Sequence, residues 1–119
     1  MTCEIIKFED NMLTVRMEGV IRLADQEAVQ NEMKGVIEKF GSAKVLVIAK
    51  NFQGWSKNDD WGDMSFLMEY GDSVTKIAFV GEERWKENAF IFAGKGLRET
   101  EIEFFTLNDF NEAERWIRL

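Results

Sequence analysis

Three aspartates form the densest group of acidic side chains near a candidate site, at Asp59, Asp60 and Asp63. Carboxylates that converge on one point can act as a general acid and base, or can hold Mg²⁺. Acidic residues in the first turn of a helix also have a structural role, because they accept hydrogen bonds from N–H groups and oppose the helix dipole. A helix is predicted to begin at about Asn58, so we favour the structural role and assign no catalytic residue.

Other residue types that support catalysis or metal binding are scarce. The 119 residues contain no histidine and a single cysteine, Cys3. Histidine is the commonest general base and transition-metal ligand, and one cysteine builds neither a disulfide framework nor a thiolate-rich zinc site. We therefore expect a protein that is not an enzyme and that holds neither a metal nor a cofactor.

The net charge of -7 restricts the partners of the chain. It argues against nucleic acid and against docking of the whole surface to anionic lipid, although an inserted apolar helix would still allow contact with a bilayer. The N-terminal residues do not resemble a secretory signal, and no apolar run approaches the length of a membrane span. No linker or repeat divides the sequence. We expect a cytoplasmic protein with a single domain over residues 1–119.

The segment 44–61 reads KVLVIAKNFQGWSKNDDW and combines an apolar strand with an aromatic loop. Residues 45–49 show no alternation, which predicts a central strand covered on both faces. Loops at the carboxyl ends of such strands often bind ligands. Trp55 follows Gly54 in this predicted loop, so we favour a place at a pocket rim for it. Trp61, in the predicted helix, fits a ligand contact and core packing equally.

The predicted helix over residues 58–70 is apolar on more than one face. Its apolar side chains are Trp61, Met64, Phe66, Leu67 and Met68. The second face is explained either by a neighbouring helix or dimer partner, or by a movable lid that contacts a ligand or a membrane. Both interpretations remain open.

A second predicted helix, over residues 83–93, also carries more apolar surface than one stripe. Trp85, Ala89 and Phe92 form an inward stripe, whereas Phe90 and Ile91 lie off it. Basic side chains are predicted near the carboxyl ends of the central strands, where they would receive an anionic head group or remain solvated. These basic residues are Lys50, Lys57, Arg84 and Lys86.

The predicted elements alternate between strand and helix after an opening hairpin. In chain order they are strands at 4–9 and 12–18, a helix from an N-cap at Asp25 to a stop at Gly41, the strand from 45, the helix at 58–70, a strand at 76–80, the helix at 83–93, a strand at 101–106, and a helix capped by Asn108 or Asp109. This β-β-α-β-α-β-α-β-α order predicts an α/β fold, a mixed sheet with parallel central strands and covering helices.

Three segments carry a resemblance to a known family: VLVIAKNFQGW, KIAFVGEERW and IEFFTLNDFNEAERWI. Their most specific landmarks are F-x-G-W at 52–55, V-G-x-x-x-W at 80–85 and E-A-x-x-W at 112–116. With the order of elements, they resemble the SpoIIAA-like family of the STAS group (sulphate transporter and anti-sigma factor antagonist domains). The similarity covers nearly the whole chain.

The resemblance implies a STAS-like domain without enzymatic activity. Relatives are thought to bind apolar or lipid-like molecules, by analogy with CRAL-TRIO lipid-transfer domains, and to associate with membranes by movement of the helix after the third strand. We therefore expect an apolar or lipid-like ligand, with peripheral membrane contact through a mobile helix near residues 59–70. The expected contacts are Phe52, Trp55, Trp61, Met64, Phe66, Met68 and Trp85, with Lys50, Lys57 and Arg84 near a head group.

Two alternatives come from other functional classes. The first is a STAS-type regulatory module that binds a protein partner or a second copy of the chain. Anti-sigma factor antagonists carry a phosphorylated serine in an Asp-Ser pair at the start of this helix, but the corresponding segment NFQGWSKNDD offers only Ser56. The second alternative is an enzyme that depends on the aspartates near residue 60.

Overall fold

A five-stranded mixed sheet forms the centre of the structure, with the strands in the order β1-β2-β3-β4-β5. The computed structural model describes residues 3–62, 65–96 and 98–119. Its strands are β1 (Cys3–Glu9), β2 (Met12–Ile21), β3 (Ala43–Trp55), β4 (Val74–Gly81) and β5 (Glu101–Thr106). β1 and β2 are antiparallel, whereas β2, β3, β4 and β5 run parallel to one another. The predicted α/β fold and element order are therefore confirmed.

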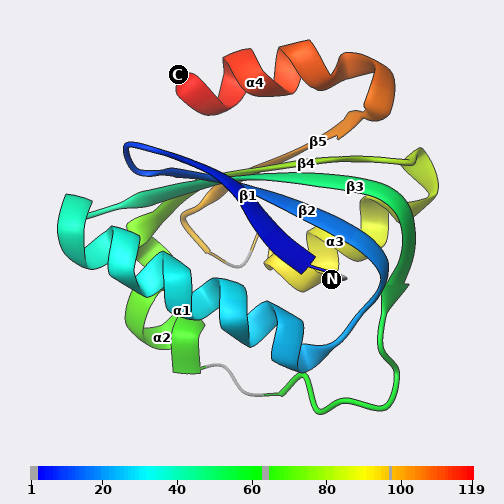
Figure 1. Cartoon of the computed structure of the whole chain (residues 1–119), viewed down its shortest axis with the longest axis horizontal. Helices are drawn as coiled ribbons and strands as arrows, with labels where there is room; N and C mark the ends of the chain where they lie inside the picture. Colours follow the sequence, from blue (N-terminus) through cyan, green and yellow to red (C-terminus); the bar gives the residue numbers. More distant parts are fainter. Residues whose placement is uncertain (1–2, 63–64, 97) are drawn as a thin grey trace.

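The helices cover both faces of the sheet (Figure 1). They are α1 (Leu23–Phe40), α2 (Ser65–Tyr70), α3 (Lys86–Ala93) and α4 (Phe110–Arg118), with short 3₁₀ turns η1 (Gly71–Ser73), η2 (Glu83–Trp85) and η3 (Leu107–Asp109). α4 lies on one face, and α1, α2 and α3 lie on the other. None of the helices in the described ranges combines the length and the apolar character that a bilayer crossing requires.

The central strand β3 is buried on both faces, as its apolar run predicts. Val45 and Val47 belong to the cluster on the α1 face, and Leu46 belongs to the cluster beneath α4. Their exposed fractions lie between 1% and 6%. Consecutive side chains of a strand point to opposite faces, so a strand covered on both sides needs apolar residues at every position.

The length of β3 was underestimated by the sequence prediction. The strand continues past the apolar run to Trp55, so Phe52 and Trp55 lie in a strand and not in a loop. Parallel pairing with β2 persists to Ile21 and Trp55, with irregularities on either side of Gly19. Asn51 takes a positive φ of 54° within this segment. The polar residues here belong to the end of the sheet, where a neighbouring strand still supplies hydrogen bonds.

The helix predicted over residues 58–70 is shorter in the structure, because its described part, α2, begins at Ser65. Side chains fold the preceding segment into a turn. The Trp61 Nε1–H donates to the Ser56 carbonyl at 2.7 Å, and Asp60 Oδ1 accepts from the Gly62 N–H at 2.9 Å. Such local bonds compete with helix formation. Trp61 therefore lies in a turn, while Asp63 and Met64 lie outside the described residues.

The boundaries of α1 confirm one predicted cap and correct the other. Gly41 ends the helix with a φ of 85°, and its N–H donates a hydrogen bond of 2.7 Å to the Ile37 carbonyl. Arg22, not Asp25, is the N-cap residue, and the Asp25 carboxylate accepts a bond of 3.1 Å from the Arg22 N–H. Asp25 is thus the third residue of the helix, and a carboxylate at this position accepts a hydrogen bond from the backbone N–H of the N-cap residue.

Candidate functional site

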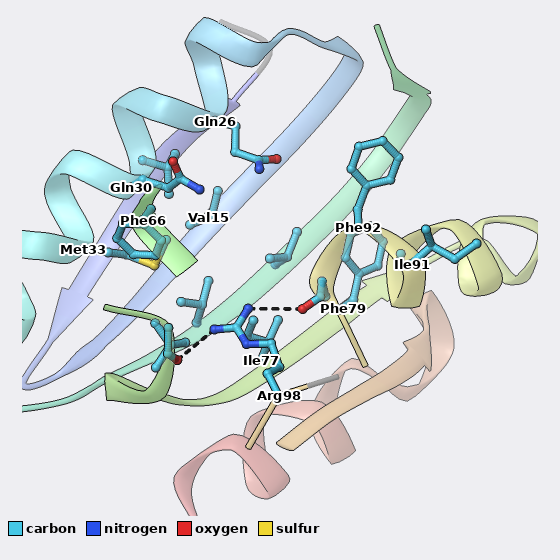
Figure 2. Close-up of a pocket in the computed structure, with 18 of the residues that line it drawn as sticks. Val15, Gln26, Gln30, Met33, Phe66, Ile77, Phe79, Ile91, Phe92 and Arg98 are labelled. Atoms are coloured by element: carbon cyan, nitrogen blue, oxygen red, sulfur yellow. Dashed lines mark hydrogen bonds between the residues drawn. The ribbon is translucent and has the colours of Figure 1, made fainter. Parts of the chain in front are cut away.

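A pocket of about 1210 Å³ lies over the sheet face that carries α1, α2 and α3 (Figure 2). Its floor is apolar and includes Val15 of β2, Val47 of β3, and Ile77 and Phe79 of β4. Cys3 also lines the floor, where burial and the nearby Asp25 carboxylate raise the pKa of its thiol to about 11. The thiol is therefore neutral at physiological pH.

Two walls rise from this floor. One consists of α1, through Val29 and Met33, together with Phe66 of α2. The other is α3, through Ala89 and Phe92. Figure 2 shows Phe66 and Met33 on one side of the space and Phe92 on the other. Pockets for drug-sized ligands have volumes of about 300 to 1,000 Å³, so this space is large for its class.

The exposure of the lining residues increases from the floor to the rim. Val15 and Val47 are 1% and 6% exposed, whereas Met68 on α2 and Ile91 on α3 are 85% and 75% exposed. The solvent-accessible space therefore lies mainly toward the rim.

An aromatic group closes one end of the pocket at the carboxyl end of β3. The rings of Trp55 and Phe92 stack with centroids 4.1 Å apart and planes within 9°. Trp61 meets Phe92 edge-on at 5.3 Å. Trp55 is half-buried, and its Nε1–H is buried without an acceptor among the described residues. Strand β3, the turn before α2, and α3 thus meet through three aromatic rings.

The predicted contact residues separate into two layers. Trp55, Trp61, Phe66 and Met68 line the pocket. Phe52 and Trp85 lie behind it, with ring centroids 5.0 Å apart, and Phe52 has no exposed surface. They support the lining aromatic rings from the core.

The predicted head-group contacts occupy other places. Lys50, Lys57 and Arg84 all belong to the described part of the chain, and none of them lines the pocket. Arg84 pairs with Glu82 at 3.5 Å, and its guanidinium lies 4.8 Å from the centre of the Trp85 ring. The order of the strands was the only basis for predicting their positions. Strand order determines at which edge of the sheet a residue lies, but not the direction in which its side chain points.

A different cation, Arg98, lines the pocket and was missed by the sequence analysis. Its Nη1 donates to the Ala93 carbonyl at 3.1 Å and its Nη2 to the Gly71 carbonyl at 2.9 Å. These bonds connect the end of α3 to η1 across the pocket (Figure 2). Burial lowers the pKa of Arg98, and the Asp72 carboxylate opposes that shift. No sequence motif marks this residue, since it follows a glycine-rich turn.

The described aspartates near residue 60 have structural partners. Asp59 Oδ2 accepts from the Leu23 N–H at 2.9 Å, and Oδ1 lies 3.6 Å from Arg22 Nη2. The pKa of Asp59 is lowered, chiefly by the bond from Leu23. Asp59 therefore caps α1 and not the helix that follows it, which corrects the prediction. No group of three or more histidine, cysteine, aspartate or glutamate side chains in the described ranges is arranged to hold a metal ion.

Comparisons with known proteins agree with this architecture. A family model described as SpoIIAA-like matches residues 12–118. A crystal structure of an uncharacterized protein from Shewanella loihica PV-4, of the DUF3478 family and with a SpoIIAA-like fold, aligns with a TM-score of 0.62 and 19% identity. The alignment covers 97% of this chain and 91% of that protein. Among curated proteins, none matches the sequence. The structural likeness supports the fold.

Proposed function

The chain belongs to the SpoIIAA-like family, and we propose that it is a cytoplasmic binding domain, without enzymatic activity, for an apolar or lipid-like ligand. The observation that carries this proposal is the pocket of about 1210 Å³ over an apolar sheet face. Transfer of an acyl chain from water to such a surface is favourable by about 25 cal/mol for each Å² buried. The polar groups on the walls would orient the ligand.

The chemistry of the site favours binding over catalysis. Asp59 and Asp60 each accept a hydrogen bond from a backbone N–H group. The Arg98 guanidinium donates to two backbone carbonyls. These groups are engaged in hydrogen bonds to the backbone that stabilise the fold. The raised pKa of the Cys3 thiol keeps it neutral. An apolar site with few ionisable groups suits recognition of a hydrocarbon chain.

The test is native mass spectrometry of protein purified from cells without detergent, followed by a binding assay on delipidated protein. We expect a retained small molecule in the first measurement. In the second, the neutral probe N-phenyl-1-naphthylamine should gain fluorescence saturably as it enters apolar surroundings. Absence of a retained molecule, together with probe fluorescence no higher than in buffer, would falsify the proposal.

Membrane contact is the second part of the proposal, and the exposed rim supports it. Met68 and Ile91 stand on opposite walls, and among the described apolar lining residues they are the most exposed. Their insertion into a bilayer would open the pocket toward lipid.

Flotation with phosphatidylcholine vesicles should show binding that Met68→Glu with Ile91→Glu abolishes. Phe8→Glu, which changes an exposed residue of β1 outside the lining, should leave it intact. Equal loss in both variants would contradict a role for the rim.

A further inference from the structure

We infer that the pocket selects a neutral amphiphile, of the class of long-chain alcohols and monoacylglycerols, over a fatty-acid anion. This inference rests on the proposed function and adds the chemistry of the head group. The features that carry it are two glutamine amides on α1 and the balance of charge around the pocket.

Gln26 and Gln30 supply the polar part of the α1 wall. They lie four residues apart, so they share one face of the helix. Figure 2 shows both side chains extending from α1 toward the space over the sheet. Neither amide has a hydrogen-bond partner among the described residues. Each amide offers donors and an acceptor, which match a hydroxyl or ester group.

The charged residues around the pocket disfavour an anion. In the described lining, Asp72 and Glu99 provide two carboxylates against the single guanidinium of Arg98. Both Nη atoms of Arg98 donate to backbone carbonyls, and its buried Nε–H has no acceptor among the described residues. A ligand carboxylate would lose hydration and meet a surplus of negative charge, in a chain whose net charge is -7. A hydroxyl group loses less hydration and is not repelled.

The experiment compares ligands that share a chain length and differ in the head group. Dodecan-1-ol, 1-monolaurin and laurate are titrated into delipidated protein at pH 8, where laurate is ionised, with displacement of N-phenyl-1-naphthylamine as the readout. We expect each neutral ligand to bind about tenfold more tightly than laurate. Laurate binding as tightly as the alcohol, or more tightly, overturns the inference and leaves the proposed function standing. Failure of all three ligands overturns both.

Variants assign the selectivity to the named groups. Gln26→Leu with Gln30→Leu should weaken dodecan-1-ol about tenfold while the affinity for laurate changes less. Gln53→Leu alters an exposed amide of β3 outside the lining and serves as the control. Asp72→Asn with Glu99→Gln should strengthen laurate binding and leave dodecan-1-ol unchanged. If neither double variant moves the ratio of the two affinities, the assignment is wrong.

Discussion

At the scale of single residues, Gly54 controls how closely the aromatic core approaches the β3 backbone. It has a φ of 92°, and a Cβ atom placed there would lie 3.0 Å from two carbons of the Trp85 ring. A side chain at this position meets both an unfavourable backbone conformation and a packed indole. Trp85 in turn supports Phe52, behind the lining of the pocket.

We predict that Gly54→Ala lowers the free energy of unfolding by about 1–3 kcal/mol, because strain and overpacking add. Urea denaturation measures the change. Gly41→Ala is the matched control, since Gly41 has a φ of 85° but no described atom within 4 Å of an added Cβ. The difference between the two variants isolates the contact with Trp85. Equal losses would mean that this contact is relaxed in solution.

The position of a single residue could be predicted from the sequence where the residue type itself restricts the surroundings of the side chain. A pocket-rim position was predicted for Trp55 as a loop residue, whereas the structure places it in β3, half-buried, among the residues that line the pocket. Arg98, Gln26 and Gln30 were not identified, because polar side chains on a helix or after a turn are usually solvated. Their position over the pocket depends on how distant elements pack, and local sequence carries no signal for that.

At the scale of elements, the segment between β3 and α2 is tied to the start of α1. The bond from the Leu23 N–H to Asp59 joins residues 36 positions apart and satisfies an N–H group in the first turn of α1. The same segment carries Trp61, which closes one end of the pocket against Phe92. The Asp59 cap therefore helps to hold that aromatic group in place.

We predict that Asp59→Ala lowers the midpoint of thermal unfolding at pH 7, and that this difference shrinks under acidic conditions. The pKa of Asp59 is lowered in the folded state, so its carboxylate stabilises the fold above the unfolded-state pKa of about 3.9. The contribution is lost as the pH falls through the lower folded-state pKa. Circular dichroism melts across this range measure it.

Asp60→Ala is the control for the Asp59 cap, because Asp60 bonds only two residues away, to the Gly62 N–H. It should have a smaller effect at pH 7, since its hydrogen bond among the described residues stays within its own turn. A loss of stability in Asp59→Ala that persisted unchanged to pH 2 would show that the ionised carboxylate contributes nothing. The pH profile thus separates a charged cap from simple loss of side-chain contacts.

The elements themselves were predictable where periodicity or a special residue marked them. β5 was predicted at its observed limits, and Gly41 ended α1 as expected. β3 and α2 were misjudged for related reasons. Polar residues at the end of β3 are kept in the strand by pairing with β2, while side-chain bonds turn the segment before α2 away from a helix. Both effects depend on partners that periodicity does not reveal.

At the scale of the whole molecule, the two faces of the sheet are packed differently. Between the sheet and α4, Val80 of β4 packs with Ala113 and Ile117 of α4, and none of the three has exposed surface. The opposite face carries the pocket between α1 and α2 on one side and α3 on the other. Both faces have buried core residues, and the described pocket lies on the face of α1, α2 and α3, with its accessible space mainly toward the rim. The proposed function depends on this asymmetry.

Two matched alanines test the asymmetry, because Ala89 of α3 and Ala113 of α4 are both buried and only Ala89 lines the pocket. Alanine and leucine have similar helix propensities, so a change to leucine reports mainly on packing. Ala113→Leu should lower the free energy of unfolding by about 1–3 kcal/mol through overpacking. Ala89→Leu should cost clearly less in urea denaturation, because the added carbons enter the pocket, and it should weaken binding of N-phenyl-1-naphthylamine. If both variants are destabilised equally and probe binding is unchanged, the α3 face is as tightly packed in solution as the α4 face. The binding proposal would then lose its physical basis.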